Sequence, residues 1–170
     1  DVYRLDRTMQ VFTMSKHANV GDRVGVDNVR IKVSDGSNVE VDVDVNYRII
    51  SDKAATIIKK VGPGDAFKNK MIRSYTRAVI REMYGALTLE TIFPQRKNQN
   101  LLVEKALNRE LEKFGIAVTL INTTNFIFNP EYDRLVKEKK AKAQEFKNQT
   151  AAQEQAVKEQ EAKVAFATRE

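Results

Sequence analysis

The clearest pattern of apolar and polar positions lies between residues 29 and 49. Apolar residues alternate strictly with polar ones along 39–49, which predicts a strand with one buried face. A shorter alternation along 29–33 predicts a partner strand, and Asp35-Gly36 marks the turn between the two. Only a loop of odd length keeps apolar side chains opposite one another, because a slip of one residue moves every side chain to the other face. The expected pairs are Val33–Val39, Ile31–Val41 and Val29–Val43.

The polar face of the longer strand carries a row of carboxylates, Glu40, Asp42 and Asp44. One interpretation of this row is a cation site, because hard cations bind carboxylate oxygens. The other is a solvated strand face with cross-strand ion pairs. The expected register sets Lys32 opposite Glu40 and Arg30 opposite Asp42. We therefore interpret the row as a solvated structural face.

Two further strands are predicted near the ends of the apolar part of the chain. The first covers about residues 2–14, and the second covers 116–128 and ends at Asn129-Pro130. The apolar face of the first is expected to carry Tyr3, Leu5, Met9 and Val11. That of the second is expected to carry Ile116, Val118, Leu120, Phe126 and Phe128, with Asn122 and Thr124 interrupting it.

Helical spacing dominates the segment between these strands. Ser51 is expected to cap a short helix that ends at Gly62, and Asp65 a second helix that ends at Gly85. A third, short helix is expected from Thr88 to Phe93, and a fourth from Pro94 to Gly115. The inward faces are expected to be Ala54, Ile57, Ile58 and Val61; Phe67, Met71, Tyr75, Ala78, Val79 and Met83; and Leu101, Leu102, Leu107, Leu111 and Phe114.

Residues 131–170 contain no Gly or Pro and are rich in Ala, Glu, Lys and Gln, which favour helix. A continuous helix here would extend roughly 60 Å and, being marginal alone, would need a neighbour to pack against. One line of positions in the tail recurs every seven residues, but the second position of each repeat is mostly polar, which makes a poor two-stranded coiled coil. Leu135, Phe146 and Val157 instead recur every eleven residues. We interpret the tail as a self-association helix; the alternative is a solvated helix ordered only near the domain. The candidate oligomerisation residues are Val136, Ala143, Phe146, Thr150, Val157 and Val164.

These elements predict an α+β fold, in which a small, mostly antiparallel sheet packs with several helices and a long C-terminal helix follows. We expect a domain over 1–129 and a coiled-coil-like segment over 130–170. The absence of cysteine excludes disulfides and thiolate metal sites, and no stretch is apolar and long enough to cross a membrane. Because the chain starts with Asp1 rather than Met, we expect a fragment whose anchor lies upstream.

Catalytic signatures are absent from the sequence. The only histidine is His17, which excludes a histidine-based triad or a paired-histidine metal site within one chain. Gly62-Pro63-Gly64 is too short to cradle a phosphate, and neither a nucleophile elbow nor a dinucleotide fingerprint occurs. We therefore expect no cofactor, no metal and no enzymatic activity.

One basic stripe remains as a candidate binding surface. Arg73, Arg77 and Arg81 recur every four residues beside Lys70, and the whole chain has a net charge of +6. The functional interpretation is contact with phosphates of nucleic acid or lipid. The structural one is the polar face of a helix that meets acidic residues, and we favour it, because no Gly-x-x-Gly loop or aromatic platform accompanies the stripe. Nucleic-acid binding is therefore the alternative function, and no nucleic-acid partner is expected.

The order of the elements resembles the SPFH or band 7 family, which includes stomatins, prohibitins and flotillins. Ser34-Asp35-Gly36 followed by 39–50 is similar to the hairpin of that family. The similarity continues in 51–55, in Ile72–Glu82, in Thr88–Phe93 with Arg96, around Phe114-Gly115-Ile116 and in the charged tail. It covers nearly the whole chain and is closest in character to the prohibitins.

The resemblance implies a non-catalytic scaffold that is attached to a membrane by an upstream apolar segment. Such proteins assemble with copies of themselves or with paralogous subunits into rings or cages, which organise membrane microdomains or enclose a membrane protease. The implied location is a bacterial or mitochondrial inner membrane. The chain departs from the family pattern in lacking the anchor and in starting the helix at 51–53 without the usual proline.

Overall fold

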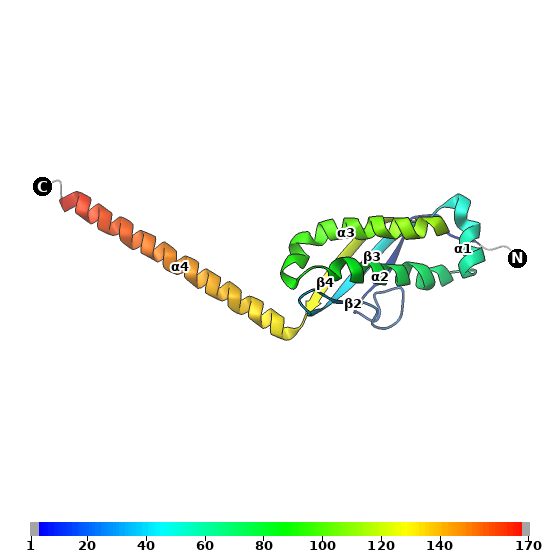
Figure 1. The fold of residues 1–170 in the computed structure, drawn as a ribbon, viewed down its shortest axis with the longest axis horizontal. Helices are drawn as coiled ribbons and strands as arrows, with labels where there is room; N and C mark the ends of the chain where they lie inside the picture. Colours follow the sequence, from blue (N-terminus) through cyan, green and yellow to red (C-terminus); the bar gives the residue numbers. More distant parts are fainter. Residues whose placement is uncertain (1–3, 168–170) are drawn as a thin grey trace. The chain divides into compact units, whose positions relative to one another are not determined.

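The computed structural model describes residues 4–167, apart from the side chains of residues 133 and 162–167. The chain divides into two compact units, residues 1–128 and 129–170. The first unit combines an antiparallel sheet with several helices, and the second is a single helix (Figure 1). The predicted α+β fold class with a long C-terminal helix is confirmed.

Strand β3 (Asn38–Ile49) is the centre of the sheet. Strand β4 (Ile116–Phe128) pairs with it along one edge. Strands β1 (Gln10–Met14) and β2 (Val29–Lys32) pair with successive parts of the other edge, and all pairs are antiparallel. The alternation that predicted β3 is confirmed, because its apolar side chains are all buried: Val39, Val41, Val43, Val45, Tyr47 and Ile49.

The β2–β3 register differs from the prediction by two residues. Val29 lies opposite Val41, and Ile31 lies opposite Val39, so apolar side chains still face one another. The loop contains only residues 34–36, and Gly36 adopts φ +86°, which lets the chain turn back after three residues. The Val33 N–H closes this loop on the Ser37 carbonyl at 2.9 Å. The parity argument was right, and the loop length was wrong.

The predicted first strand was wrong in its extent and its buried face. It begins at Gln10 rather than near residue 2, and its buried side chains are Phe12 and Met14. Met9 and Val11 are 63% and 52% exposed. Phe12 lies opposite Val45 and therefore faces the same side as the core of β3. Of the predicted face, Leu5 is half-buried and Tyr3 lies outside the described residues.

Two irregularities change the face of β4 along its length. Ile116 and Val118 are buried as predicted, but Leu120 is 50% exposed and Ile121 is buried instead. The pairing with β3 shifts between Asn46 and Tyr47, because one extra β4 residue is inserted there. A second shift falls where Asn125 adopts φ +47°. A strict alternation along the whole strand was therefore the wrong expectation.

Helices α1 (Ala54–Val61) and α2 (Ser74–Gly85) follow the hairpin, and Gly62 ends α1 as predicted. The turn Ser51–Lys53 before α1 is 3₁₀, and Lys68–Arg73 before α2 is π-helical. Phe67, Met71 and Val79 are buried as predicted, but the rest of the stripe is rotated. The wider π turn delays the following side chains by about one position. The buried stripe therefore continues through Ile72, Thr76, Ile80 and Tyr84 rather than Tyr75, Ala78 and Met83.

Helix α3 (Leu89–Leu111) is one continuous helix and does not break at Pro94. Thr88 and Thr91 form a capping box at its start, and Pro94 lies near this end, where few backbone bonds are lost. Because the helix is not interrupted at Pro94, Leu101 and Leu102 lie away from its buried side and are 49% and 40% exposed. The inward side chains are Leu89, Ile92, Gln99, Val103, Leu107 and Leu111, and Glu112–Phe114 form a final 3₁₀ turn.

Helices α2 and α3 cover one face of the sheet, with α3 along β4 (Figure 1). One side chain of α3 also binds the backbone of β4. The Asn108 amide donates to the Val118 carbonyl and accepts from the Val118 N–H, each at 2.7 Å. Both backbone groups that Val118 would offer to another strand are thereby occupied by a side chain.

Helix α4 (Pro130–Ala167) spans 38 residues. It begins at proline, whose missing N–H is not needed in a first turn. The Asn129 side chain accepts the Glu131 N–H at 3.2 Å and so satisfies one of the free donors at this end. The helix continues without interruption through the Ala-, Glu- and Lys-rich sequence, as its composition predicted.

Candidate functional site

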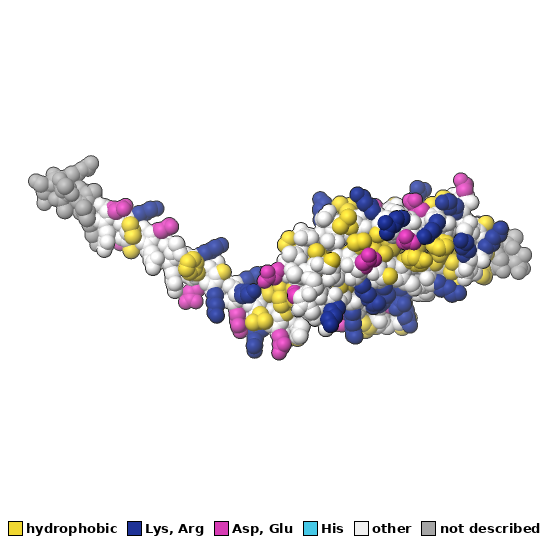
Figure 2. All heavy atoms as spheres, viewed as in Figure 1, with side chains coloured by type: hydrophobic (Ala, Val, Ile, Leu, Met, Phe, Trp, Pro, Cys, Tyr) yellow, Lys and Arg dark blue, Asp and Glu magenta, His cyan; other side chains and the backbone are white. Residues whose placement is uncertain are grey.

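The candidate oligomerisation surface lies on α4. Every described side chain from 137 to 161 is exposed. They include two large apolar groups that a soluble helix normally buries, because Phe146 is 71% exposed and Val157 is 54% exposed. Leu135, just before this range, is 51% exposed. Figure 2 shows apolar side chains at intervals along the helix, between charged groups of both signs.

Leu135, Phe146 and Val157 are eleven residues apart, which is close to three full turns of an α-helix. They therefore share one side of α4, and we call them the α4 stripe. The seven-residue positions make a weaker line, because Ala143 and Thr150 are small or polar and exposed. Val136 is half-buried, and the Val164 side chain lies outside the described residues. The role of these residues in oligomerisation stays a prediction.

Several neighbouring residues of α4 make polar contacts with one another. The Arg134 and Glu138 side chains approach to 3.7 Å, and the Gln144 amide donates to Asn148 at 3.1 Å. The Thr150 hydroxyl donates to the Phe146 carbonyl at 2.9 Å, so it does not need an outside partner. Such exposed contacts add at most a few tenths of a kcal/mol each, about 0.2–0.5. These contacts do not cover the α4 stripe, whose large apolar side chains stay exposed to solvent.

The basic stripe runs from the π-helical turn Lys68–Arg73 into α2, and its arginines lie along the segment that leads into β2. Arg73 Nε donates to the Asp27 carboxylate at 2.9 Å. Arg77 donates to the main-chain carbonyls of Asp27 and Asn28 at 2.6 and 3.0 Å, and Arg81 donates to that of Arg30 at 3.1 Å. The four-residue spacing of the arginines thus matches successive positions of one extended segment.

Asp27 is the residue that the sequence pattern did not single out. Its side chain is 1% exposed, and Arg73 and Arg77 both bind its Oδ1. Its own N–H donates to the Ser15 carbonyl at 2.8 Å. A lone acid before a short strand carries no periodic signal, and only the preference for an acidic partner of the stripe pointed towards it. Because Arg73 and Arg77 already hold a carboxylate, they are poorly placed to bind an outside phosphate.

The Asp27 contacts predict a pH dependence of stability. Burial raises the pKa of the Asp27 carboxyl, but the hydrogen bond from Arg73 and the charges of Arg77 and Arg73 outweigh it, so that the pKa lies below its ordinary 3.8. The ionised carboxylate therefore stabilises the fold above this ordinary pKa, and its contribution is lost as the pH falls through the lowered value. We expect the free energy of unfolding in urea to fall below about pH 4. In Asp27→Asn the free energy of unfolding should fall less steeply with pH. The same slope in both proteins would show that the Asp27 carboxylate does not cause the decline.

The carboxylate row is not the solvated face that we predicted. Asp42 is 4% exposed and accepts hydrogen bonds from Ser15, the Lys16 N–H and Asn125. The Asn125 side chain, which lies at the second shift in the β3–β4 pairing, donates to Asp42 at 2.9 Å. Glu40 pairs with Arg30 at 2.8 Å and Lys16 at 3.4 Å, not with Lys32. Asp44 accepts from Thr13 at 2.8 Å.

The remaining sequence candidates have simple surroundings. His17 is exposed, and its main-chain N–H donates to the Ser15 hydroxyl at 3.1 Å. Among the side chains that the structure describes, no group of histidine, cysteine, aspartate or glutamate is arranged to hold a metal ion. None of the helices described is both long and apolar enough to cross a membrane. Lys70 reaches the Val61 carbonyl at 3.4 Å and remains exposed.

Comparison with known proteins assigns the family. No curated protein matched the chain. The model of the SPFH domain / Band 7 family matches residues 1–163, which includes the sheet, the helices packed on it and most of α4. The family resemblance seen in the hairpin and in Ile72–Glu82 is therefore confirmed, and the chain belongs to the SPFH / Band 7 family.

Proposed function

We propose that this chain is the assembly module of a non-catalytic, membrane-associated scaffold. Copies of the chain, alone or with paralogous prohibitin-like subunits, associate through α4 into rings or cages. These particles organise membrane microdomains or surround a membrane protease. The SPFH / Band 7 family is generally membrane-associated and non-enzymatic, which supports the general part of this proposal.

The observation that carries the proposal is the exposed α4 stripe. A solitary helix of this kind gains little from its own backbone bonds, and most helices are stabilised by packing an apolar face. Burying each of the three large side chains against a neighbour would contribute about 1.5–3 kcal/mol. The alternating charges around the stripe favour a neighbour that also carries both signs, and another α4 has this property.

Attachment to the membrane is proposed to use a segment upstream of residue 1. The particle would then sit on a bacterial or mitochondrial inner membrane. The alternative function, nucleic-acid binding through the α2 arginines, has less support, because Asp27 and main-chain carbonyls occupy Arg73, Arg77 and Arg81.

Truncation tests the role of α4. A chain that ends at Pro130 retains the whole first unit, so we expect it to stay folded, with the cooperative unfolding of the full chain. Its mass by light scattering should be that of a monomer at concentrations where the full chain forms larger particles. Equal masses for the two chains, with the full chain larger than a monomer, would place assembly outside α4. A full chain that remains monomeric even when reconstituted with its membrane anchor would reject the proposal.

A further inference from the structure

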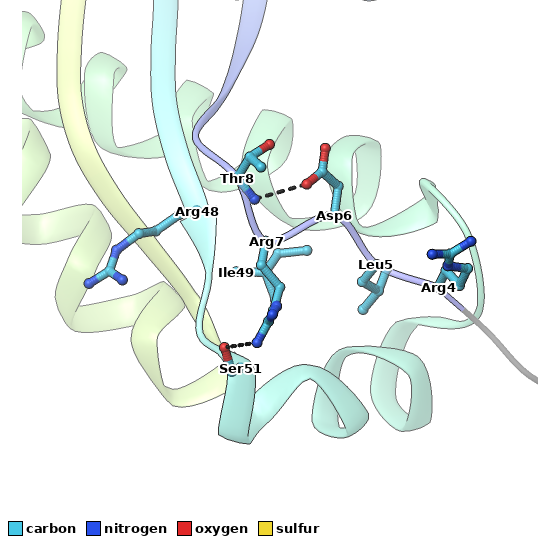
Figure 3. A pocket seen from close by; sticks show the side chains of 8 residues that line it. All are labelled: Arg4, Leu5, Asp6, Arg7, Thr8, Arg48, Ile49 and Ser51. Atoms are coloured by element: carbon cyan, nitrogen blue, oxygen red, sulfur yellow. Dashed lines mark hydrogen bonds between the residues drawn. The ribbon is translucent and has the colours of Figure 1, made fainter.

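A basic hollow lies between the start of the described chain and the end of β3 (Figure 3). It has a volume of about 700 Å³ and opens to solvent. Residues 4–8 form one wall, and the last residues of β3 with Ser51 form the other. The lining side chains are Arg4, Leu5, Asp6, Arg7, Thr8, Arg48, Ile49 and Ser51. No feature of the sequence pattern pointed to this hollow.

Cationic groups dominate the hollow. It is lined by Arg4, Arg7 and Arg48 against the single carboxylate of Asp6. That carboxylate accepts the Thr8 N–H at 2.9 Å, which lowers its pKa, so it is ionised at neutral pH. Three guanidinium groups and one carboxylate leave two positive charges unbalanced. A ligand with negative charge would neutralise them.

Two arginines of the hollow differ from Arg73, Arg77 and Arg81 in their surroundings. The guanidiniums of the α2 stripe each have a carboxylate or carbonyl partner. Arg4 and Arg48 make no hydrogen bond or ion pair with any residue that the structure describes, and both are exposed. Figure 3 shows them on either side of Arg7, which donates to the Ser51 hydroxyl at 3.1 Å. The hollow thus holds two guanidiniums without a partner among the described residues, and a third, that of Arg7, which the Ser51 hydroxyl positions.

Guanidinium groups bind phosphate oxygens through paired N–H donors. The hollow also has apolar lining, because Leu5 and Ile49 lie between the arginines. A purely inorganic ion would use only the charges, whereas a phosphoester would also contact these carbons. We propose that the hollow binds a phosphate ester, either the headgroup of an anionic phospholipid or a soluble phosphoester. This site is separate from α4 and goes beyond the scaffold function.

Vesicle binding and a soluble competitor distinguish the two sources. The full chain is mixed with vesicles of phosphatidylglycerol and phosphatidylcholine, or of phosphatidylcholine alone, and its sedimentation is measured. The test variant is Arg4→Gln with Arg48→Gln, because both side chains are exposed and neither makes a hydrogen bond or ion pair with a described residue. The matched control is Lys105→Gln with Arg109→Gln, which removes the same charge from the exposed side of α3. A parallel titration with glycerol phosphate follows the guanidinium N–H signals of the native chain by NMR.

We expect the native chain and the control to bind the anionic vesicles, and the test variant to bind them about 30-fold more weakly. Binding to vesicles without a response to glycerol phosphate assigns the lipid, and shifts of the arginine signals at low millimolar glycerol phosphate assign a soluble ester. Equal binding of the test variant and the native chain, together with unshifted signals, would overturn the site. The NMR arm keeps the test decisive if the variant misfolds. Light scattering of the same samples reports assembly separately, so a failure of the scaffold proposal is recognised independently.

Discussion

Replacing Asp27 by alanine is expected to destabilise the first unit by about 3 kcal/mol, because it leaves two guanidiniums facing each other without their carboxylate. Arg73 and Arg77 are only 23% and 18% exposed, so water screens this repulsion poorly. The removal also frees the segment that the arginines hold against α2. Urea denaturation followed by circular dichroism measures the change in the free energy of unfolding.

Two further variants separate this explanation from a general loss of packing. Adding Arg77→Met to Asp27→Ala should recover part of the stability, because it removes one of the unpaired charges. Asp52→Ala removes an exposed acid and should change the free energy of unfolding by less than about 0.5 kcal/mol. If Asp27→Ala were as stable as the native chain, the contacts of Arg73 and Arg77 would have no structural role.

If copies of the chain associate through α4 as proposed, placing glutamate at two positions of the α4 stripe will abolish this association. Phe146→Glu with Val157→Glu removes two apolar groups whose burial would contribute about 3–6 kcal/mol per contact, which corresponds to a dissociation constant raised more than about 100-fold. Glutamate favours helix as well as the residues that it replaces, so α4 itself should persist. Sedimentation velocity over a range of protein concentrations measures the effect.

The matched control lies on the opposite side of the same helix. Ala151→Glu with Gln155→Glu adds the same two charges, at positions turned about 140–180° away from Phe146 by the helical repeat. This control should assemble as the native chain does. If both double variants dissociate equally, charge alone governs assembly and the stripe has no special role.

The alternation of β3 was sufficient to predict its buried face, because every second residue is apolar over six successive repeats. The same reasoning failed where the chain inserts a residue. The bulge between Leu120 and Val118 in β4 and the π turn over Lys68–Arg73 both shift the phase, and neither has a glycine or proline to announce it. Phase errors of one residue therefore account for the misplaced Leu120 and Tyr75.

Contacts between distant segments were harder to predict than elements. The Asp27 carboxylate lies 46 residues from Arg73, and only the packing of α2 on β2 brings them together. The hollow beside Arg48 depends in the same way on the path of residues 4–8, whose strand was predicted too long. By contrast, the eleven-residue spacing of Leu135, Phe146 and Val157 is local, so it can be read from the sequence, and the structure shows that all three side chains are exposed.

The hydrogen bonds between the Asn108 amide and Val118 limit the pairing of the outer edge of β4 with other strands. β4 has thirteen residues, and among the described strands it pairs with β3 alone. Its other edge is therefore open, and an open edge of that length invites cross-β aggregation. By filling the hydrogen-bonding slot at Val118, Asn108 interrupts the row of groups that a foreign strand would need. The edge of β4 is therefore interrupted at Val118, and a strand of another molecule could not extend the sheet past this residue without displacing Asn108.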